Sequence, residues 1–215
     1  MTELIFAKSF GVNTFSFTRG AKASASPATR IGGTAPLGVD YEQLSEAIAR
    51  GDTEHIYLKY GAGDGEEGSY GAIDLDGVKG GGANDFSTWL TYGYNGTIEV
   101  GDDLLPVEKG NMDGPTARSI NERYNACTHY ADDGGCSCAH YELTCPRVLK
   151  VLVIEKIGCS YVKVKGFAAF VLEGEAGDKG EVLGSYVKYL EPGESLVEDA
   201  WDSADFGIYN VGLTK

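Results

Sequence analysis

The chain has 215 residues, of which 42% are hydrophobic, and it carries a net charge of −14 at pH 7. A chain of this length buries about 70% of the surface that it exposes when unfolded, so it can form one large domain. The acidic balance argues against nucleic acid as a partner, because such binding depends on neutralising phosphates with Lys and Arg. No stretch reaches the roughly 18 apolar residues of a membrane-spanning helix, so we expect no membrane span.

Residues 1–39 have the composition of an N-terminal arm and linker, and residues 40–215 that of a single β-rich domain. The arm contains two short strand-like pieces, and the second places Phe15 and Phe17 on one face. Residues 20–36 consist mainly of Ala, Ser, Gly, Thr and Pro without periodicity, which is typical of a linker. A strand on such a linker can complete the sheet edge of a neighbouring copy.

The charge is unevenly distributed along the chain. Residues 1–39 carry a net charge of +3, whereas residues 173–205 carry a net charge of −8. This asymmetry favours a head-to-tail contact between subunits, and a head-to-tail contact that does not close produces a filament. The residues that we expect at the contact are Phe15, Phe17, Lys8 and Arg19.

Two or three short α-helices are predicted. The clearest covers residues 40–50, because Asp40 can cap its first amide groups and Gly51 can end it. A second helix is predicted over residues 85–92. A third starts near Pro115, a residue that is favoured in the first turn of a helix.

Most of the remaining chain is predicted to form β-strands, at residues 54–60, 70–75, 97–100, 147–156, 160–171, 182–190 and 207–213. The strongest signals lie beyond residue 146, where the apolar runs are typical of strands buried on both faces. We therefore expect a mainly β fold, β-sandwich-like or a mixed sheet, with α+β as the alternative. The expected core of the sheet is Val148, Leu149, Val151, Val153, Val162, Val164, Phe167, Phe170 and Leu172.

Acidic residues beside glycines form a candidate calcium site. Residues 61–68 read GAGDGEEG, and the candidate ligands are Asp64, Asp74 and Asp76. Calcium prefers such oxygen ligands, although the third carboxylate of an EF-hand spacing is absent. The same composition is typical of a hairpin tip, which is the alternative interpretation.

Residues 127–145, the cysteine loop, contain four of the five cysteines and two of the three histidines. The candidate disulfide or metal-binding residues are Cys127, Cys136, Cys138, Cys145, His129 and His140. Their spacing differs from the usual zinc pairs, but Cys136, Cys138 and His140 alternate and would share one face of a strand.

Three chemistries use such residues. Disulfides would hold a loop that is too polar and rich in glycine to fold by burial alone. A zinc ion would be bound by thiolates and imidazole, and a Cys–His pair would supply a nucleophile. We expect cross-linking rather than catalysis, because four cysteines bracket a segment with few core residues. The odd total leaves at least one thiol free or paired between subunits.

Six segments occur in an order that resembles a known family: 68–77 (GSYGAIDLDG), 92–96 (YGYNG), 100–102 (VGD), 108–116 (EKGNMDGPT), 145–148 (CPRV) and 164–173 (VKGFAAFVLE). The succession resembles the extracytoplasmic part of TadE/TadG-like (Flp pilus-assembly-like) proteins of Gram-positive bacteria, over roughly residues 36–190. The resemblance implies a non-enzymatic, pilus- or filament-associated role at the cell surface. The N-terminal membrane helix of that family is replaced here by the polar, strand-prone arm.

We therefore expect a non-enzymatic structural subunit of an extracellular or surface filament, a homo-oligomer that polymerises through its arm without a cofactor. The alternative is a monomeric cell-surface binding module that holds zinc at the cysteine loop or calcium at the acidic loops. Neither G-x-S-x-G nor H-E-x-x-H is present, which argues against the hydrolases that use them. The expected location is extracellular or on the cell or spore surface, although the N-terminus has no secretory-signal pattern.

Overall fold

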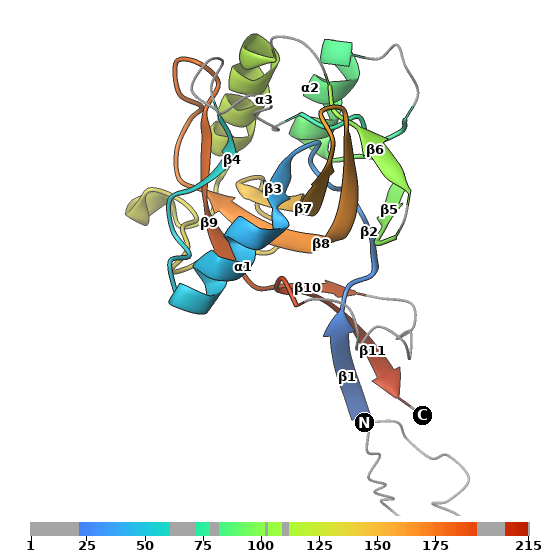
Figure 1. Cartoon of the computed structure of the whole chain (residues 1–215). Coiled ribbons are helices and arrows are strands. Elements are labelled where there is room, and N and C mark those ends of the chain that lie inside the picture. Colours follow the sequence, from blue (N-terminus) through green and yellow to red (C-terminus); the bar gives the residue numbers. More distant parts are fainter. Residues whose placement is uncertain are drawn as a thin grey trace, which may run out of the picture.

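The structure is a computed structural model that describes residues 22–60, 72–77, 82–101, 103–108, 112–192 and 205–214. Within these residues the fold is mainly β, with several mixed sheets and three α-helices, as the sequence predicts. Figure 1 shows the largest sheet at the centre of the molecule, with helices packed around it. Among the described residues, no helix combines the length and the apolar character needed to cross a membrane.

The strands are β1 (Lys22–Pro27), β2 (Arg30–Gly32), β3 (Gly38–Asp40), β4 (Ile56–Lys59), β5 (Thr97–Glu99), β6 (Leu104–Pro106), β7 (Val148–Ile157), β8 (Tyr161–Leu172), β9 (Val182–Val187), β10 (Tyr189–Pro192) and β11 (Ile208–Thr214). The α-helices are α1 (Tyr41–Arg50), α2 (Gly82–Tyr92) and α3 (Asp113–Asn125), and a 3₁₀ helix covers Ala131–Asp133.

The central sheet is organised around the antiparallel hairpin of β7 and β8. Its order is β3-β7-β8-β9-β4, and β6 pairs with the first residues of β8. The β3 strand runs parallel to β7, and the other pairs are antiparallel. A bulge in the hairpin falls between Val153 and Ile154.

Both faces of the hairpin are buried, because side chains alternate along a strand. On one face, residues such as Phe170 pack with Leu44 of α1, Phe86 of α2 and Ile120 of α3. On the other face, the core includes Ile31 of β2 and two buried cysteines of the cysteine loop. All nine predicted core residues are buried: Val148, Leu149, Val151, Val153, Val162, Val164, Phe167, Phe170 and Leu172.

Helix α1 confirms the capping signals in the sequence. The carboxylate of Asp40 accepts hydrogen bonds from the amides of Glu42 (3.0 Å) and Gln43 (3.2 Å). Gly51 ends the helix in the left-handed conformation with φ of 78°, which a glycine adopts without steric cost.

The prediction of a linker over residues 20–36 is wrong from Lys22 onward. Strand β1 pairs with β11, β2 pairs with β5, and β3 belongs to the central sheet. Small residues between the strands, such as Thr34 and Ala35, are almost completely buried. The composition of residues 20–36 suggested a linker because most of these residues, such as Thr34 and Ala35, have small side chains. The predicted contact residues Phe15, Phe17, Lys8 and Arg19 lie outside the described residues.

Another strand prediction differs from the structure. The described part of the predicted strand 70–75 forms only a single bridge, between Ile73 and Val107. The strand that follows Asn95 and Gly96 is present as β5, but it pairs with β2. The pair Asn95 and Gly96 is typical of a hairpin turn, but among the described residues β5 pairs with the distant β2 and not with the segment before that turn.

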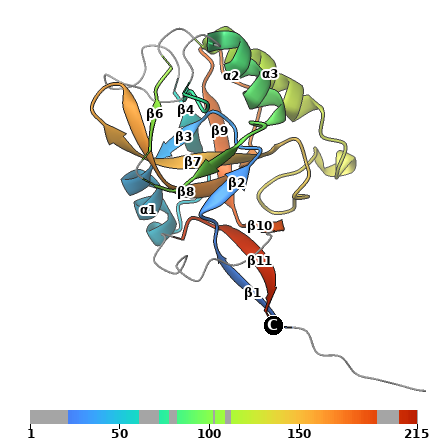
Figure 2. The ribbon, with the colours of Figure 1, turned by 90° about the vertical axis from the view of Figure 1, so that its right-hand side faces the viewer.

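Strands β1 and β11 form an antiparallel ribbon that extends away from the body of the protein (Figures 1 and 2). Lys22, the first described residue, pairs with Thr214 near the end of the chain. The three-stranded sheet has the order β1-β11-β10, so β1 lies at an edge. Within the described residues, the outer side of β1 has no strand partner.

Candidate functional site

The cysteine loop connects α3 to β7 and lies against the central sheet. The chain reverses direction at Tyr130, Gly134 and Gly135, which all have positive φ values. Glycine is favoured at such positions, and Gly135 has a further constraint. A Cβ atom at Gly135 would lie 2.5 Å from a guanidinium nitrogen of Arg147. The two glycines therefore allow the loop to close around this arginine.

The loop brings Cys127, His129, Cys136 and Cys145 together. One potential ligand atom from each of the four residues lies within 4.8 Å of all the others. Cys136 and Cys145 are each only 2% exposed, and the other two residues are half-buried. The sulfur atoms of Cys127 and Cys145 are 3.4 Å apart. We call these four residues the Cys₃His cluster.

The prediction that the loop is cross-linked by disulfides is wrong in this structure. All five cysteines are free thiols, and the separation of 3.4 Å between Cys127 and Cys145 exceeds the disulfide bond length of about 2.05 Å. The reason is geometric: three sulfurs and one imidazole converge on a common point instead of forming pairs.

Backbone amides donate hydrogen bonds to two of the sulfurs. The amide of Cys136 donates to the sulfur of Cys127, and the amide of Arg147 donates to the sulfur of Cys145, each at 3.4 Å. Burial alone would raise the pKa of Cys127, but the Cys136 amide and the Cys145 thiol lower it to about 6. Burial raises the pKa of Cys145 to about 12. The cluster therefore contains one sulfur whose surroundings favour a thiolate.

Arg147 holds the loop against α3. Its guanidinium donates to the carbonyl oxygens of Tyr124 (3.0 Å), Gly134 (2.8 Å) and Cys136 (3.2 Å). It also lies 3.8 Å from the centroid of the Tyr124 ring, a cation–π contact. Arg147 directly follows Cys145 and Pro146 in the sequence, but no local pattern assigns this role to it.

Arg123 is a second arginine beside the Cys₃His cluster. It donates to the carbonyl oxygens of Leu90, Thr91, Pro146 and Val148 at 2.7–3.1 Å. Burial lowers the pKa of Arg123 to about 10, and the charge of Cys145 acts in the opposite direction. Within the described residues, neither Arg123 nor Arg147 pairs with a carboxylate.

Cys138 and His140 do not join the cluster. The exposed thiol of Cys138 lies 3.6 Å from a carboxylate oxygen of Glu54. The His140 ring packs edge-on against Tyr130, with the centroids 4.6 Å apart. The expected strand over Cys136, Cys138 and His140 is a tight turn, closed by a bridge between Ser137 and His140. A turn does not place alternate residues on one face, which explains the wrong grouping.

A polar pocket of about 350 Å³ lies beside the loop. Its wall includes Glu173, which accepts hydrogen bonds from the Ser185 hydroxyl (2.6 Å) and from the backbone amide of His55 (2.7 Å). The His55 ring nitrogen lies 2.6 Å from the other oxygen of the same carboxylate. Burial would raise the pKa of Glu173, but Ser185 and His55 hold it below its ordinary value. Arg147 and the exposed thiol of Cys138 also line the pocket.

The calcium candidates are only partly described. Asp64 lies outside the described residues, and the described part of the chain contains no metal-binding group that includes Asp74 or Asp76. The buried carboxylate of Asp74 accepts hydrogen bonds from the amides of Asp76 (3.3 Å) and Gly77 (3.1 Å), and so forms a turn. Calcium binding at these residues stays a prediction.

The environment of Asp74 predicts a specific pH dependence. Burial and the neighbouring Asp76 raise the pKa of Asp74 to about 6. The folded state therefore binds this proton more tightly than the unfolded state does. The contribution of the proton to the free energy of unfolding is fully present below about pH 4 and is lost as the pH rises through about 6. We expect Asp74→Asn, which keeps the turn acceptor, to stabilise the protein by roughly 1–2 kcal/mol at pH 7.5 and by almost nothing at pH 4. Urea unfolding at the two pH values measures this, and an equal effect at both would contradict it.

Comparison of the chain with protein-family models, with curated proteins and with solved structures finds no match. The resemblance to TadE/TadG-like proteins therefore stays a prediction from the six sequence segments.

Proposed function

We propose that this protein is a non-enzymatic structural subunit that joins other copies of itself by strand addition at the edge of β1. The observation that carries this proposal is the β1–β11 ribbon, which extends from the body and leaves the outer side of β1 without a described strand partner (Figure 2). An exposed strand edge is a template for pairing with another chain.

The occupant that we propose for this edge is the N-terminal segment of a second copy, residues 1–21. Its sequence contains the strand-like pieces with Phe15 and Phe17, and backbone pairing would supply affinity while the two rings set the register. Residues 1–21 carry a net charge of +1, from Lys8 and Arg19 against Glu3, and residues 173–205 carry a net charge of −8, so the two segments attract each other. Attraction between exposed charges is screened by salt, so assembly should weaken at high ionic strength.

Deletion of residues 1–21 is expected to leave a folded monomer, because every described element is retained. Light scattering coupled to size exclusion measures the mass over a range of concentrations, and electron microscopy shows whether filaments form. The melting temperature should fall by less than about 2–4 °C, the shift that corresponds to 1 kcal/mol in a domain of this size. The matched control is full-length Phe15→Ser/Phe17→Ser, which keeps length and charge and should also be monomeric. Assembly of the truncated protein would contradict the proposal.

A second candidate function is a monomeric binding module, and the polar pocket beside the cysteine loop favours it. The same experiment separates the two functions. A full-length protein that stays monomeric at high concentration would reject the filament and favour the binding module.

A further inference from the structure

We propose that Cys127, His129, Cys136 and Cys145 bind one zinc ion, and that this ion holds the cysteine loop closed. The proposal is independent of the assembly function proposed above. Three thiolates and one imidazole form one of the usual ligand sets of structural zinc sites, which are four-coordinate and tetrahedral.

The distances fit such a site. In a tetrahedral zinc site, bonds of about 2.3 Å to sulfur and about 2.0 Å to nitrogen place neighbouring ligand atoms roughly 3.5–3.8 Å apart. The four ligand atoms of the cluster already lie within 4.8 Å of one another, and the Cys127 and Cys145 sulfurs are 3.4 Å apart. Adjustments of about 1 Å in side-chain positions therefore suffice to bind the ion.

An unpaired buried atom supports the same site independently. The Nδ1 atom of His129 is buried and has no hydrogen-bond partner. Burial of such a polar atom without a partner costs roughly 1–3 kcal/mol, so buried nitrogen atoms are normally paired. His129 lies among three sulfurs, and coordination would give an imidazole at this position a partner.

The local charge balance also favours a metal–thiolate centre. Arg123 and Arg147 approach the cluster, and their described hydrogen bonds are to carbonyl oxygens. Buried cations are normally paired with negative charge. A Zn²⁺ ion with three thiolates and one neutral imidazole carries a net charge of −1, which would partly compensate the two arginines. Three neutral thiols would not.

The backbone is arranged to support the thiolates. The amides of Cys136 and Arg147 donate to the sulfurs of Cys127 and Cys145, and such hydrogen bonds stabilise the charged form that zinc requires. All four ligands belong to a closed, largely buried group. Zinc sites that lack an open coordination position are structural rather than catalytic, so the ion would replace the disulfides expected from the sequence.

The test is the metal content of reduced full-length protein, equilibrated with zinc and then freed of unbound metal. Elemental mass spectrometry is expected to find one zinc ion per chain, and a chelator should lower the melting temperature. Cobalt substitution should give the absorption spectrum of tetrahedral Co²⁺ with thiolate ligands. We expect Cys136→Ser to abolish stoichiometric binding and His129→Asn to weaken it about 100-fold, since four ligands share the total binding free energy.

Matched controls lie in the same chain. Cys159→Ser removes an exposed cysteine at the β7–β8 turn, and Cys138→Ser and His140→Asn remove the two loop residues outside the cluster. All three variants should bind zinc like the wild type. The proposal is overturned if the reduced, folded protein binds no zinc, or if His129→Asn binds as tightly as the wild type. If the protein instead retained one copper or iron ion per chain under the same conditions, zinc would be rejected as the metal.

Discussion

Phe170→Ala is expected to destabilise the protein by about 3–5 kcal/mol, the usual cost of truncating a fully buried phenylalanine. The Phe170 side chain is 0% exposed and lies in the core beneath the helices. Its ring packs edge-on against Tyr186, with the centroids 6.0 Å apart. Truncation would leave a cavity between the central sheet and the helices, because the surrounding strands are fixed by pairing on both sides of β8.

Urea unfolding, followed by circular dichroism, measures this loss. The matched control is Tyr161→Ala, which removes a ring of similar size that is 46% exposed on the same strand. We expect the control to cost less than about 1 kcal/mol, as is usual at surface positions. A cost below about 1 kcal/mol for Phe170→Ala would show that the sheet tolerates the cavity and that our assignment of the core is wrong.

The sequence predicts the central hairpin and α1 well because the signals for both are local. Long apolar runs predict the strands β7 and β8, and the pair Asp40 and Gly51 predicts both ends of α1. These features depend on neighbouring residues in the chain. The nine core residues follow from the same runs, since a strand covered on both faces buries nearly every side chain.

The sequence prediction fails where small residues pack against distant segments. Strand β1 consists mainly of small residues and pairs with β11, and the three-residue strand β2 pairs with β5. Nothing in their own composition distinguishes such strands from a linker. The strands β1 and β2 form because they pair with segments that lie roughly 70 to 190 residues further along the chain.

For the cysteine loop, the sequence identifies the right segment but the wrong grouping. Alternation of Cys136, Cys138 and His140 suggested one face of a strand, whereas the turn at residues 137–140 separates them. The actual cluster combines Cys127 and His129 with two cysteines that arrive from the far side of Gly134 and Gly135. The contribution of Arg147 could not be predicted, because it depends on how the loop folds around the guanidinium.

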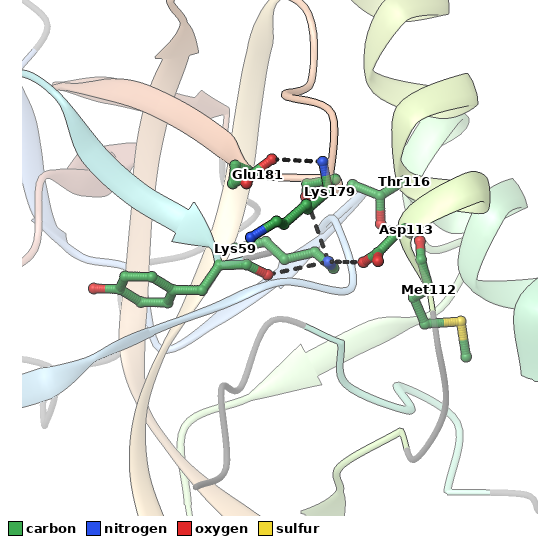
Figure 3. A network of polar contacts seen from close by, with 8 residues as sticks. Lys59, Met112, Asp113, Thr116, Lys179 and Glu181 are labelled. Atoms are coloured by element: carbon green, nitrogen blue, oxygen red, sulfur yellow. Dashed lines mark hydrogen bonds and ion pairs between the residues drawn. The ribbon is translucent and has the colours of Figure 1, made fainter. Parts of the chain in front are cut away.

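The second large effect is expected at the ion pair between Lys59 of β4 and Asp113 at the start of α3. The Lys59 side chain is 8% exposed, and its amine lies 3.1 Å from the Asp113 carboxylate. Figure 3 shows the Lys59 amine beside the Asp113 carboxylate. The amine also donates to the carbonyl oxygens of Tyr60 (3.2 Å) and Gly180 (3.4 Å). The close approach of Gly180 requires a glycine, since a Cβ atom there would lie 2.8 Å from the Cα atom of Asp113.

Asp113→Leu should cost about 3–5 kcal/mol, because it leaves the ammonium group of Lys59 buried without a countercharge. Lys59→Met should cost less, about 1–3 kcal/mol. The remaining carboxylate is 20% exposed and lies at the N-terminus of a helix, where negative charge is stabilised. The double variant is expected to be more stable than Asp113→Leu alone, since an apolar pair often replaces a buried ion pair without loss of stability.

Urea unfolding of the wild type, the two single variants and the double variant gives the coupling energy. Simple additivity of the two single effects would show that the pair is not coupled and that Lys59 is solvated when Asp113 is absent.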